Sequence, residues 1–362
     1  MIEIDGSYLE GGGQILRTAV SLSAITQKPC RIFNIRKGRE RQGLAMQHLL
    51  GIQALARLCN GKLEGDKLGS SEIEFSPGDI KEGPHSLERK ISLERKISLE
   101  IKIETAGSIT LLLQTLIPPS LFAHSKNSGQ ASNPVKITFE GGATDTFFSP
   151  TMDYLQYVFL KILEKMGVKM EIKIMKRGYY PAGGAKVEVL VFPSRPKFIN
   201  LTERGGFKKI TAFSGASDAL KEKKVAERQI AGVREVLGKL KLPLEERIEY
   251  CETESPGSHI CLISEFENTV IGTDNLGKLG KRAEDVGKEA ASELLKIAKS
   301  DACLDKHLAD QILPYMALFS AKSSVSVSEI TKHAKTNIWV IEKFMDGKFT
   351  IKENTISWIS KA

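Results

Sequence analysis

The chain has 362 residues, of which 41% are hydrophobic, so it can form two domains or one large domain with an insertion. No apolar run reaches the length of a membrane span and no secretory signal is visible, which predicts a cytoplasmic protein that does not bind membranes. The net charge of +8 favours polyanionic partners, although a solvated surface rich in lysine and glutamate gives the same balance. Five widely spaced cysteines predict reduced, buried thiols and argue against a zinc site.

Helical and strand patterns alternate from the N-terminus onward in three similar series. The first predicts helices over 15–25 and 44–59 and strands at 30–35, 73–75 and 101–103. The second predicts a helix over 108–122 broken near Pro118, a strand at 135–139, a helix over 154–166 and a strand at 168–175. The third predicts helices over 283–299, 309–318 and 338–345 and a strand at 324–327. Together they indicate an α+β fold whose large domain holds three repeated α/β units, each a sheet with helices on one face.

A block of different character separates the second series from the third. It predicts strands at 187–192 and 210–213, a charged helix over 216–240 and a hairpin formed by 248–253 and 260–265. We interpret it as a small α/β domain, 186–274, inserted into a large domain formed by 1–185 and 275–362.

A six-residue stretch, 86–91, is repeated in tandem at 92–97 and begins again at Ser98. Its imperfect alternation is compatible with a strand or with a short helix, and we expect an exposed protrusion. Its basic residues are suited to contacts with RNA, but a solvated insertion is the commoner outcome for such a segment.

Three glycines follow Glu10, just before the predicted helix that starts at Ile15. Backbone N–H groups at a helix start can hold a phosphate. The stretch is neither a Walker A loop nor a Rossmann fingerprint, however. On the residues alone, an ordinary tight turn is as good an interpretation as a phosphate site.

Four arginines lie close together in the sequence: Arg17, Arg36, Arg39 and Arg41. Guanidinium groups make bidentate contacts with phosphate, which ammonium groups cannot. A solvated loop is the competing interpretation for the later three. Arg17 argues against it, because it lies among apolar neighbours and small residues on a predicted helix.

His333 lies between a predicted strand and a predicted helix. The positive end of a helix dipole favours the neutral imidazole, which is a good nucleophile toward a phosphoryl group. By itself, a surface or capping histidine is the better interpretation of this residue. The other five histidines have no stronger individual case.

Taken in order, these segments resemble the RNA 3′-terminal phosphate cyclase family. The resemblance covers nearly the whole chain, and the ordered set is more specific than any one motif. The matching segments are 10–17, 35–39, 43–49, 106–108, 113–115, 141–145, 179–184, 308–311 and 333–337.

The resemblance implies an ATP-dependent enzyme that converts an RNA 3′-phosphate into a 2′,3′-cyclic phosphate. It implies a histidine–AMP adduct, transfer of AMP to the RNA end, and attack by the neighbouring 2′-hydroxyl, which has a high effective molarity. The implied partners are ATP, Mg²⁺ or Mn²⁺, and RNA with a 3′-phosphate end. The oligomeric state stays open, with a homodimer among the alternatives.

The resemblance also implies roles for individual residues. His333 matches the nucleophile, and Glu10 matches an acidic position suited to a divalent metal. Residues expected around the phosphates are Arg17, Arg36, Arg39 and Gln47. Residues expected in the nucleotide pocket are Gln114, Pro150, Asp153, His307, Leu308, Asp310 and Gln311.

Three features depart from the family pattern. His307 stands where some relatives have tyrosine, and its imidazole can still stack on adenine. The tandem repeat looks like an insertion ahead of the site. The inserted domain matches the family more weakly; the resemblance suggests a thioredoxin-like fold without redox chemistry, because no Cys-x-x-Cys is present.

Two other functions compete with the cyclase. One is a non-catalytic RNA-binding relative that acts in ribosomal RNA processing, which would lack the nucleophilic histidine. The other is a small-molecule transferase of similar architecture, such as an enolpyruvyl transferase, because a fold does not fix a function. The presence of His333, Arg17, Arg36 and Arg39 favours the cyclase.

Overall fold

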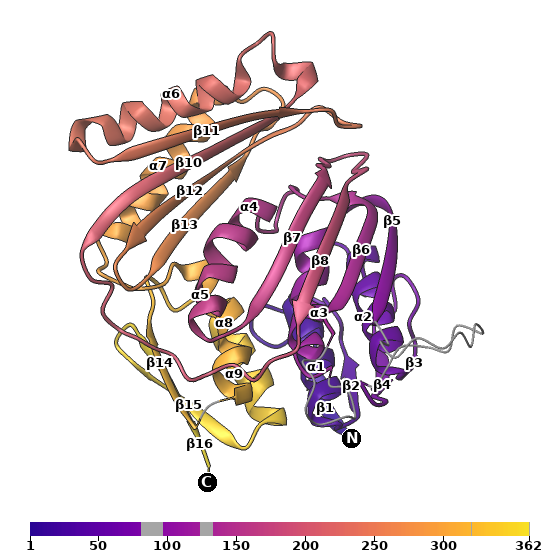
Figure 1. The fold of residues 1–362 in the computed structure, drawn as a ribbon. Helices are drawn as coiled ribbons and strands as arrows, with labels where there is room; N and C mark the ends of the chain where they lie inside the picture. The colour runs from indigo at the N-terminus through magenta and orange to yellow at the C-terminus, as the bar shows by residue number, and fades with distance from the viewer. Residues whose placement is uncertain (81–96, 124–132, 320, 362) are drawn as a thin grey trace.

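The fold consists of three copies of one β-α-β-α-β-β unit, with a fourth sheet inserted into the third copy (Figure 1). In each copy the first two strands pair in parallel, and the fourth strand pairs antiparallel with the second and the third. The computed structural model describes residues 1–80, 97–123, 133–319 and 321–361, so residues 86–96 of the tandem repeat lie outside the described residues. The repeated strand order confirms the predicted α+β fold of repeated units.

The first two units follow each other along the chain. The first comprises β1 (Ile2–Asp5), α1 (Gly13–Thr26), β2 (Cys30–Phe33), α2 (Met46–Cys59), β3 (Lys62–Glu64) and β4 (Ile73–Ser76). The second comprises β5 (Ser98–Ser108), α3 (Ile109–Ser120), β6 (Val135–Ala143), α4 (Met152–Tyr154), the π-helical turn η1 (Leu155–Phe159), α5 (Leu160–Lys165), β7 (Lys169–Lys176) and β8 (Lys186–Phe192). The expected break near Pro118 is absent, because α3 continues through it to Ser120.

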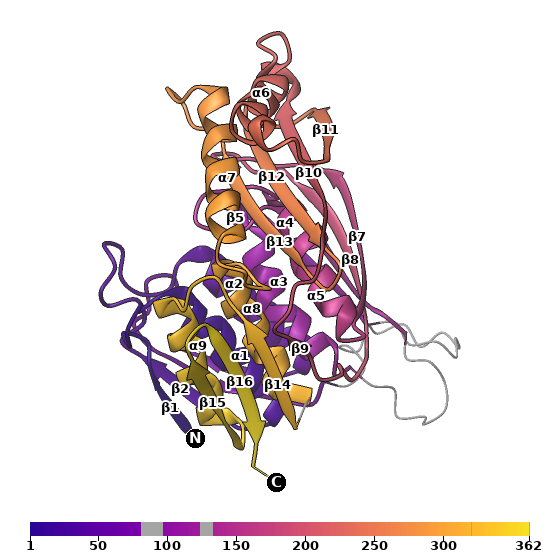
Figure 2. The same cartoon turned by 90° about the vertical axis from the view of Figure 1, so that its left-hand side faces the viewer.

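The third unit is split by the insertion. It comprises β9 (Asn200–Leu201), α8 (Lys306–Phe319), β14 (Lys322–Ser326), α9 (Lys332–Phe344), β15 (Gly347–Lys352) and β16 (Thr355–Ser360). Figure 2 shows its yellow strands beside α8 and α9. The last predicted helix starts earlier than expected, because the Thr331 hydroxyl accepts a hydrogen bond from Ala334 N at 3.0 Å and caps α9. His333 therefore lies in the first turn of α9.

The inserted unit is a four-stranded sheet with two helices. It comprises β10 (Phe207–Ser217), η2 (Asp218–Leu220), α6 (Val225–Leu237), η3 (Gly238–Leu240), β11 (Leu244–Cys251), β12 (Ser258–Phe266), β13 (Val270–Leu276) and α7 (Ala283–Ala298). Residues from both helices and from the sheet form a hydrophobic core separate from the main one. The thioredoxin-like likeness of this unit stays a prediction.

Three elements differ from the sequence-based expectations. The strand assigned to the inserted block, β8, pairs with β6 and β7 and completes the second sheet. The helix assigned to the third unit, α7, packs against α6, where a Cβ on Gly287 would lie 1.9 Å from the Gln229 carbonyl oxygen. The predicted hairpin is wrong, because β10 lies between β11 and β12. These contacts favour an inserted unit that spans 207–298 instead of the predicted 186–274.

The helices of the three units share one hydrophobic core. Helix α1 packs against α2, α3 and α9, and α8 packs against α3 and α9. This packing brings together the N-terminal turns of α1 and α9, where Gln14 Nε2 donates to the His333 carbonyl oxygen at 3.1 Å. No helix of the described chain is long and apolar enough to cross a membrane.

Candidate active site

An open cleft of about 950 Å³ lies where the three units meet the inserted sheet. Most of the residues predicted for the site, from widely separated parts of the sequence, line this cleft. They are Glu10, Arg17, Arg36, Arg39, Gln47, Gln114, Pro150, His307, Asp310, Gln311 and His333. Their individual roles stay predictions.

His333 lies between two carboxylates in the cleft. Its Nδ1 is 3.6 Å from Asp310 Oδ2, and its Nε2 is 3.6 Å from Glu10 Oε1. Both distances exceed a hydrogen-bond length. The side chain of His333 is 46% exposed, so a ligand in the cleft can reach it.

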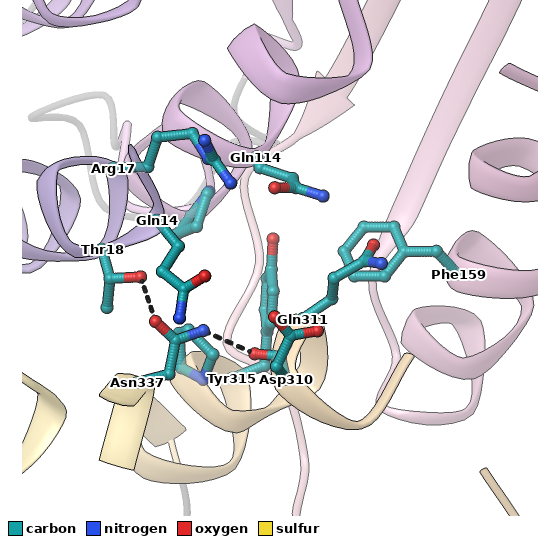
Figure 3. Close-up of a pocket in the computed structure, with 11 residues that line it drawn as sticks. Gln14, Arg17, Thr18, Gln114, Phe159, Asp310, Gln311, Tyr315 and Asn337 are labelled. Carbon is teal, nitrogen blue, oxygen red and sulfur yellow. Dashed lines mark hydrogen bonds between the residues drawn. The ribbon is translucent and has the colours of Figure 1, made fainter. Parts of the chain in front are cut away.

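The arginines approach the same cleft from two elements. Arg17 projects from α1 toward Gln114, and burial lowers its pKa to about 10 against the opposing effect of Asp310 (Figure 3). Burial, and then the positive charge of Arg39, also lowers the pKa of Arg36. These guanidinium groups remain charged at neutral pH but are poorly solvated, so an anion in the cleft would stabilise them.

The glycine stretch gives the cleft a helix N-terminus. Gly12, which caps α1, has no side chain to satisfy the first N–H groups of the helix; the Ile15 N–H bonds to the Gly12 carbonyl oxygen at 3.3 Å, and the N–H groups of Gly13 and Gln14 are placed to bind an anion. Gly13 has a second reason to be glycine, because a Cβ there would lie 1.9 Å from Nε2 of the buried His48. The stretch is therefore shaped both for anion binding and for close packing on His48.

We expect Gly13→Ala to destabilise the protein by about 1–3 kcal/mol, because the added methyl group overlaps the buried imidazole of His48. Chemical denaturation measures this loss. Gly12→Ala is the matched control, since its Cβ would lie 3.4 Å from the Arg39 guanidinium, an ordinary contact, and should cost less than about 1 kcal/mol. Equal losses for the two variants would contradict the packing argument.

The other wall of the cleft is suited to a nucleotide. Pro150 precedes α4, and its carbonyl oxygen accepts a hydrogen bond from Thr110 Oγ1 at 2.9 Å. On α8, Gln311 Nε2 donates to the His307 carbonyl oxygen at 3.0 Å. An exposed imidazole and a proline ring on one cleft provide the flat surfaces that a purine base packs against.

Two predicted pocket residues lie outside the cleft lining. Leu308 is fully buried in the main core. Asp153 is buried at the boundary with the inserted sheet, where its carboxylate lies 3.0 Å from the Arg177 guanidinium and 2.6 Å from His259 Nε2. Asp153 is thus placed for a structural ion pair, because both of its oxygens already have partners.

The sequence reasoning missed several residues of the cleft, among them His48 and Asp274. His48 follows Gln47 directly and lines the cleft; burial, and then Arg17 and Arg36, lower its pKa to about 3. Its imidazole is therefore neutral. Asp274 comes from β13 of the inserted unit, and its Oδ2 accepts a hydrogen bond from Thr151 N at 2.6 Å. No local pattern in the sequence marks Asp274, since only the packing of the insertion brings it to the cleft.

Glu10 is the acidic residue predicted to bind a divalent cation. Its Oε1 lies 2.8 Å from Arg39 Nη2. Within the described ranges, no group of three or more His, Cys, Asp or Glu side chains could hold a metal ion. A single carboxylate such as that of Glu10 fits a Mg²⁺ or Mn²⁺ ion that is held mainly by nucleotide phosphates.

The cleft is lined by three arginines, a helix N-terminus and an accessible histidine. These groups are typical of a phosphoryl-transfer site. The sequence model of the RNA 3′-terminal phosphate cyclase family matches residues 8–351, and the chain belongs to this family. Similar proteins are the RNA 3′-terminal phosphate cyclases of Pyrococcus furiosus, 44% identical over 97% of this chain and 95% of the relative, and of Sulfolobus acidocaldarius, 40% identical over 97% of each. The cyclase of Thermococcus kodakarensis is 43% identical over 97% of this chain and 94% of its own.

Proposed function

We propose that the protein uses ATP to convert an RNA 3′-phosphate into a 2′,3′-cyclic phosphate, with His333 as the nucleophile. The observation that carries this proposal is that His333 lines the same cleft as Arg17, Arg36 and Arg39. Membership of the cyclase family supports the reaction, and the geometry supports the assignment of the residues.

In the first step, the imidazole of His333 attacks the α-phosphorus of ATP. A P–N bond forms, the α–β P–O bond breaks, and pyrophosphate leaves. With its proton on Nδ1, which faces the Asp310 carboxylate, His333 would attack through Nε2. The arginines offset the negative charge that develops during transfer.

In the second step, an oxygen of the RNA 3′-phosphate attacks the phosphorus of the adduct, forming a P–O bond and releasing His333. In the third, the adjacent 2′-oxygen attacks the activated 3′-phosphorus, loses its proton and expels AMP. AMP is a far better leaving group than a phosphate oxygen, and the vicinal hydroxyl needs no further positioning. A divalent cation held by Glu10 and the ATP phosphates would neutralise charge on the triphosphate.

The experiment is to incubate the protein with a divalent cation, ATP labelled at the α-phosphate, and RNA ending in a 3′-phosphate. We expect an acid-labile, hydroxylamine-sensitive protein–AMP adduct and a cyclic RNA end. RNA that ends in a 3′-hydroxyl is the control and should leave the adduct in place. RNA binding with neither adduct nor cyclisation would instead support the non-catalytic alternative.

Arg39→Ala should slow cyclisation by about 100-fold, because it removes a guanidinium from the phosphate side of the cleft. The fold should survive, since the Arg39 side chain is 41% exposed and its ion pair with Glu10 is at the surface. Single-turnover cyclisation measures the rate, and circular dichroism checks the fold. Lys37→Ala, at an exposed position of the same loop outside the cleft lining, should stay within about twofold of wild type. A wild-type rate for Arg39→Ala would remove Arg39 from the site.

A further inference from the structure

A buried amide joins the three helices that carry the reactive groups. Asn337 lies four residues after His333 on α9 and is 5% exposed. Its Oδ1 accepts a hydrogen bond from Thr18 Oγ1 on α1 at 3.0 Å, and its Nδ2 donates to the Asp310 carbonyl oxygen on α8 at 3.0 Å (Figure 3). The side chain therefore uses its donor and its acceptor on two different helices.

Each partner of Asn337 is next to, or part of, a group that faces the cleft. Thr18 follows Arg17 directly. Asp310 holds its carboxylate 3.6 Å from His333 Nδ1. A turn before Thr18, Gln14 donates to the His333 carbonyl oxygen at 3.1 Å and so joins the same two helices one turn nearer their N-termini. The position of Asp310 relative to His333 thus depends on the two hydrogen bonds of Asn337.

We propose that Asn337 is a positioning residue that sets the approach of His333 to the α-phosphate by fixing α8 and α1 against α9. The inference rests on the proposed function of His333. A displacement of about 1 Å at a reacting group can slow a reaction about 100-fold, because the reacting atoms must then be aligned during the reaction, which costs entropy. Asn337 is not among the residues that line the cleft; it lines the smaller adjoining pocket and reaches the cleft through its hydrogen bond to the Asp310 backbone, so its effect is on geometry.

Near-isosteric substitutions separate the two hydrogen bonds. Asn337→Asp keeps an acceptor for Thr18 but places an oxygen against the Asp310 carbonyl oxygen. Thr18→Val removes the donor to Asn337 and leaves the contact with Asp310 in place. Asn354→Asp is the matched control, because Asn354 is exposed in the turn between β15 and β16, away from the cleft.

The test measures the single-turnover rate of protein–AMP formation at saturating ATP, the affinity for an ATP analogue with a non-cleavable α–β bond, and the pH–rate profile. For Asn337→Asp we expect a rate loss of about 10- to 100-fold, analogue affinity within about twofold of wild type, and a shifted pH–rate midpoint. Thr18→Val should lose about threefold to tenfold in rate. A merely structural role would lower the melting temperature of Thr18→Val, which adds no charge, without moving its pH–rate midpoint.

The outcomes distinguish this inference from the proposed function. If wild type forms no adduct, the proposed function fails first, and with it the premise of the inference. If wild type forms the adduct, and both Asn337→Asp and Thr18→Val match its rate and its pH profile, only the positioning role is overturned. If Asn337→Asp fails to fold, the rate and pH profile of Thr18→Val decide.

Discussion

Replacing His333 with alanine is expected to abolish the protein–AMP adduct, because no other group in the proposed scheme attacks the α-phosphorus. The same variant should still cyclise RNA that already carries AMP on its 3′-phosphate, since the third step uses the RNA's own 2′-hydroxyl. Labelling with α-phosphate-labelled ATP measures the first effect, and conversion of pre-adenylated RNA measures the second.

Lys335→Ala is the control for His333→Ala, because Lys335 is an exposed neighbour in the same turn of α9. It should form the adduct at a rate close to that of wild type. Persistence of the adduct in His333→Ala would overturn the nucleophile assignment. His48 would be a poor substitute, because it is buried at 6% exposure and packs directly against Gly13.

Arg177→Ala is expected to lower the free energy of unfolding by about 3–5 kcal/mol, because it leaves buried carboxylates without their cation. The Arg177 guanidinium lies 3.3 Å from Asp145, 3.0 Å from Asp153 and 2.9 Å from Glu249. Asp145 and Asp153 are almost fully buried, and the two of them with Glu249 raise the pKa of Arg177 against the effect of burial. Chemical denaturation monitored by tryptophan fluorescence measures the loss.

The adjacent residue provides a matched control. Lys176 pairs with Glu254 at 3.1 Å, but both side chains are exposed, so Lys176→Ala should cost less than about 1 kcal/mol. Arg177→Lys should recover only part of the stability, because one ammonium group cannot reach three carboxylates. Because Glu249 lies in the inserted sheet and Asp153 in the second unit, the Arg177 network joins the two. A loss below about 1 kcal/mol for Arg177→Ala would show that the network contributes little to stability.

The sequence predicted most of the local structure but misplaced several elements. Apolar periodicity predicted helix α7 correctly, because amphipathicity is a property of the segment itself. It assigned α7 to the wrong unit, because the pattern shows that a helix has an apolar face and does not show which sheet covers it. The hairpin prediction failed for a related reason. Strands β11 and β12 are consecutive in the sequence, but α6 connects β10 to β11, so that β11 pairs in parallel with β10. Strand β10 therefore lies between β11 and β12 and separates them.

The sequence by itself determined the α+β class, the positions of most helices and strands, and a resemblance specific enough to indicate the family. It did so because apolar periodicity and the order of the motifs are properties of the sequence itself and do not depend on tertiary packing. Only the tertiary structure decided which residues share the cleft: it brought Asp274 from the inserted sheet, placed Asp153 in the Arg177 ion-pair network, and put Asp310 beside His333. These outcomes depend on how helices from three units pack on one core, and that packing joins residues more than 300 positions apart, such as Thr18 and Asn337.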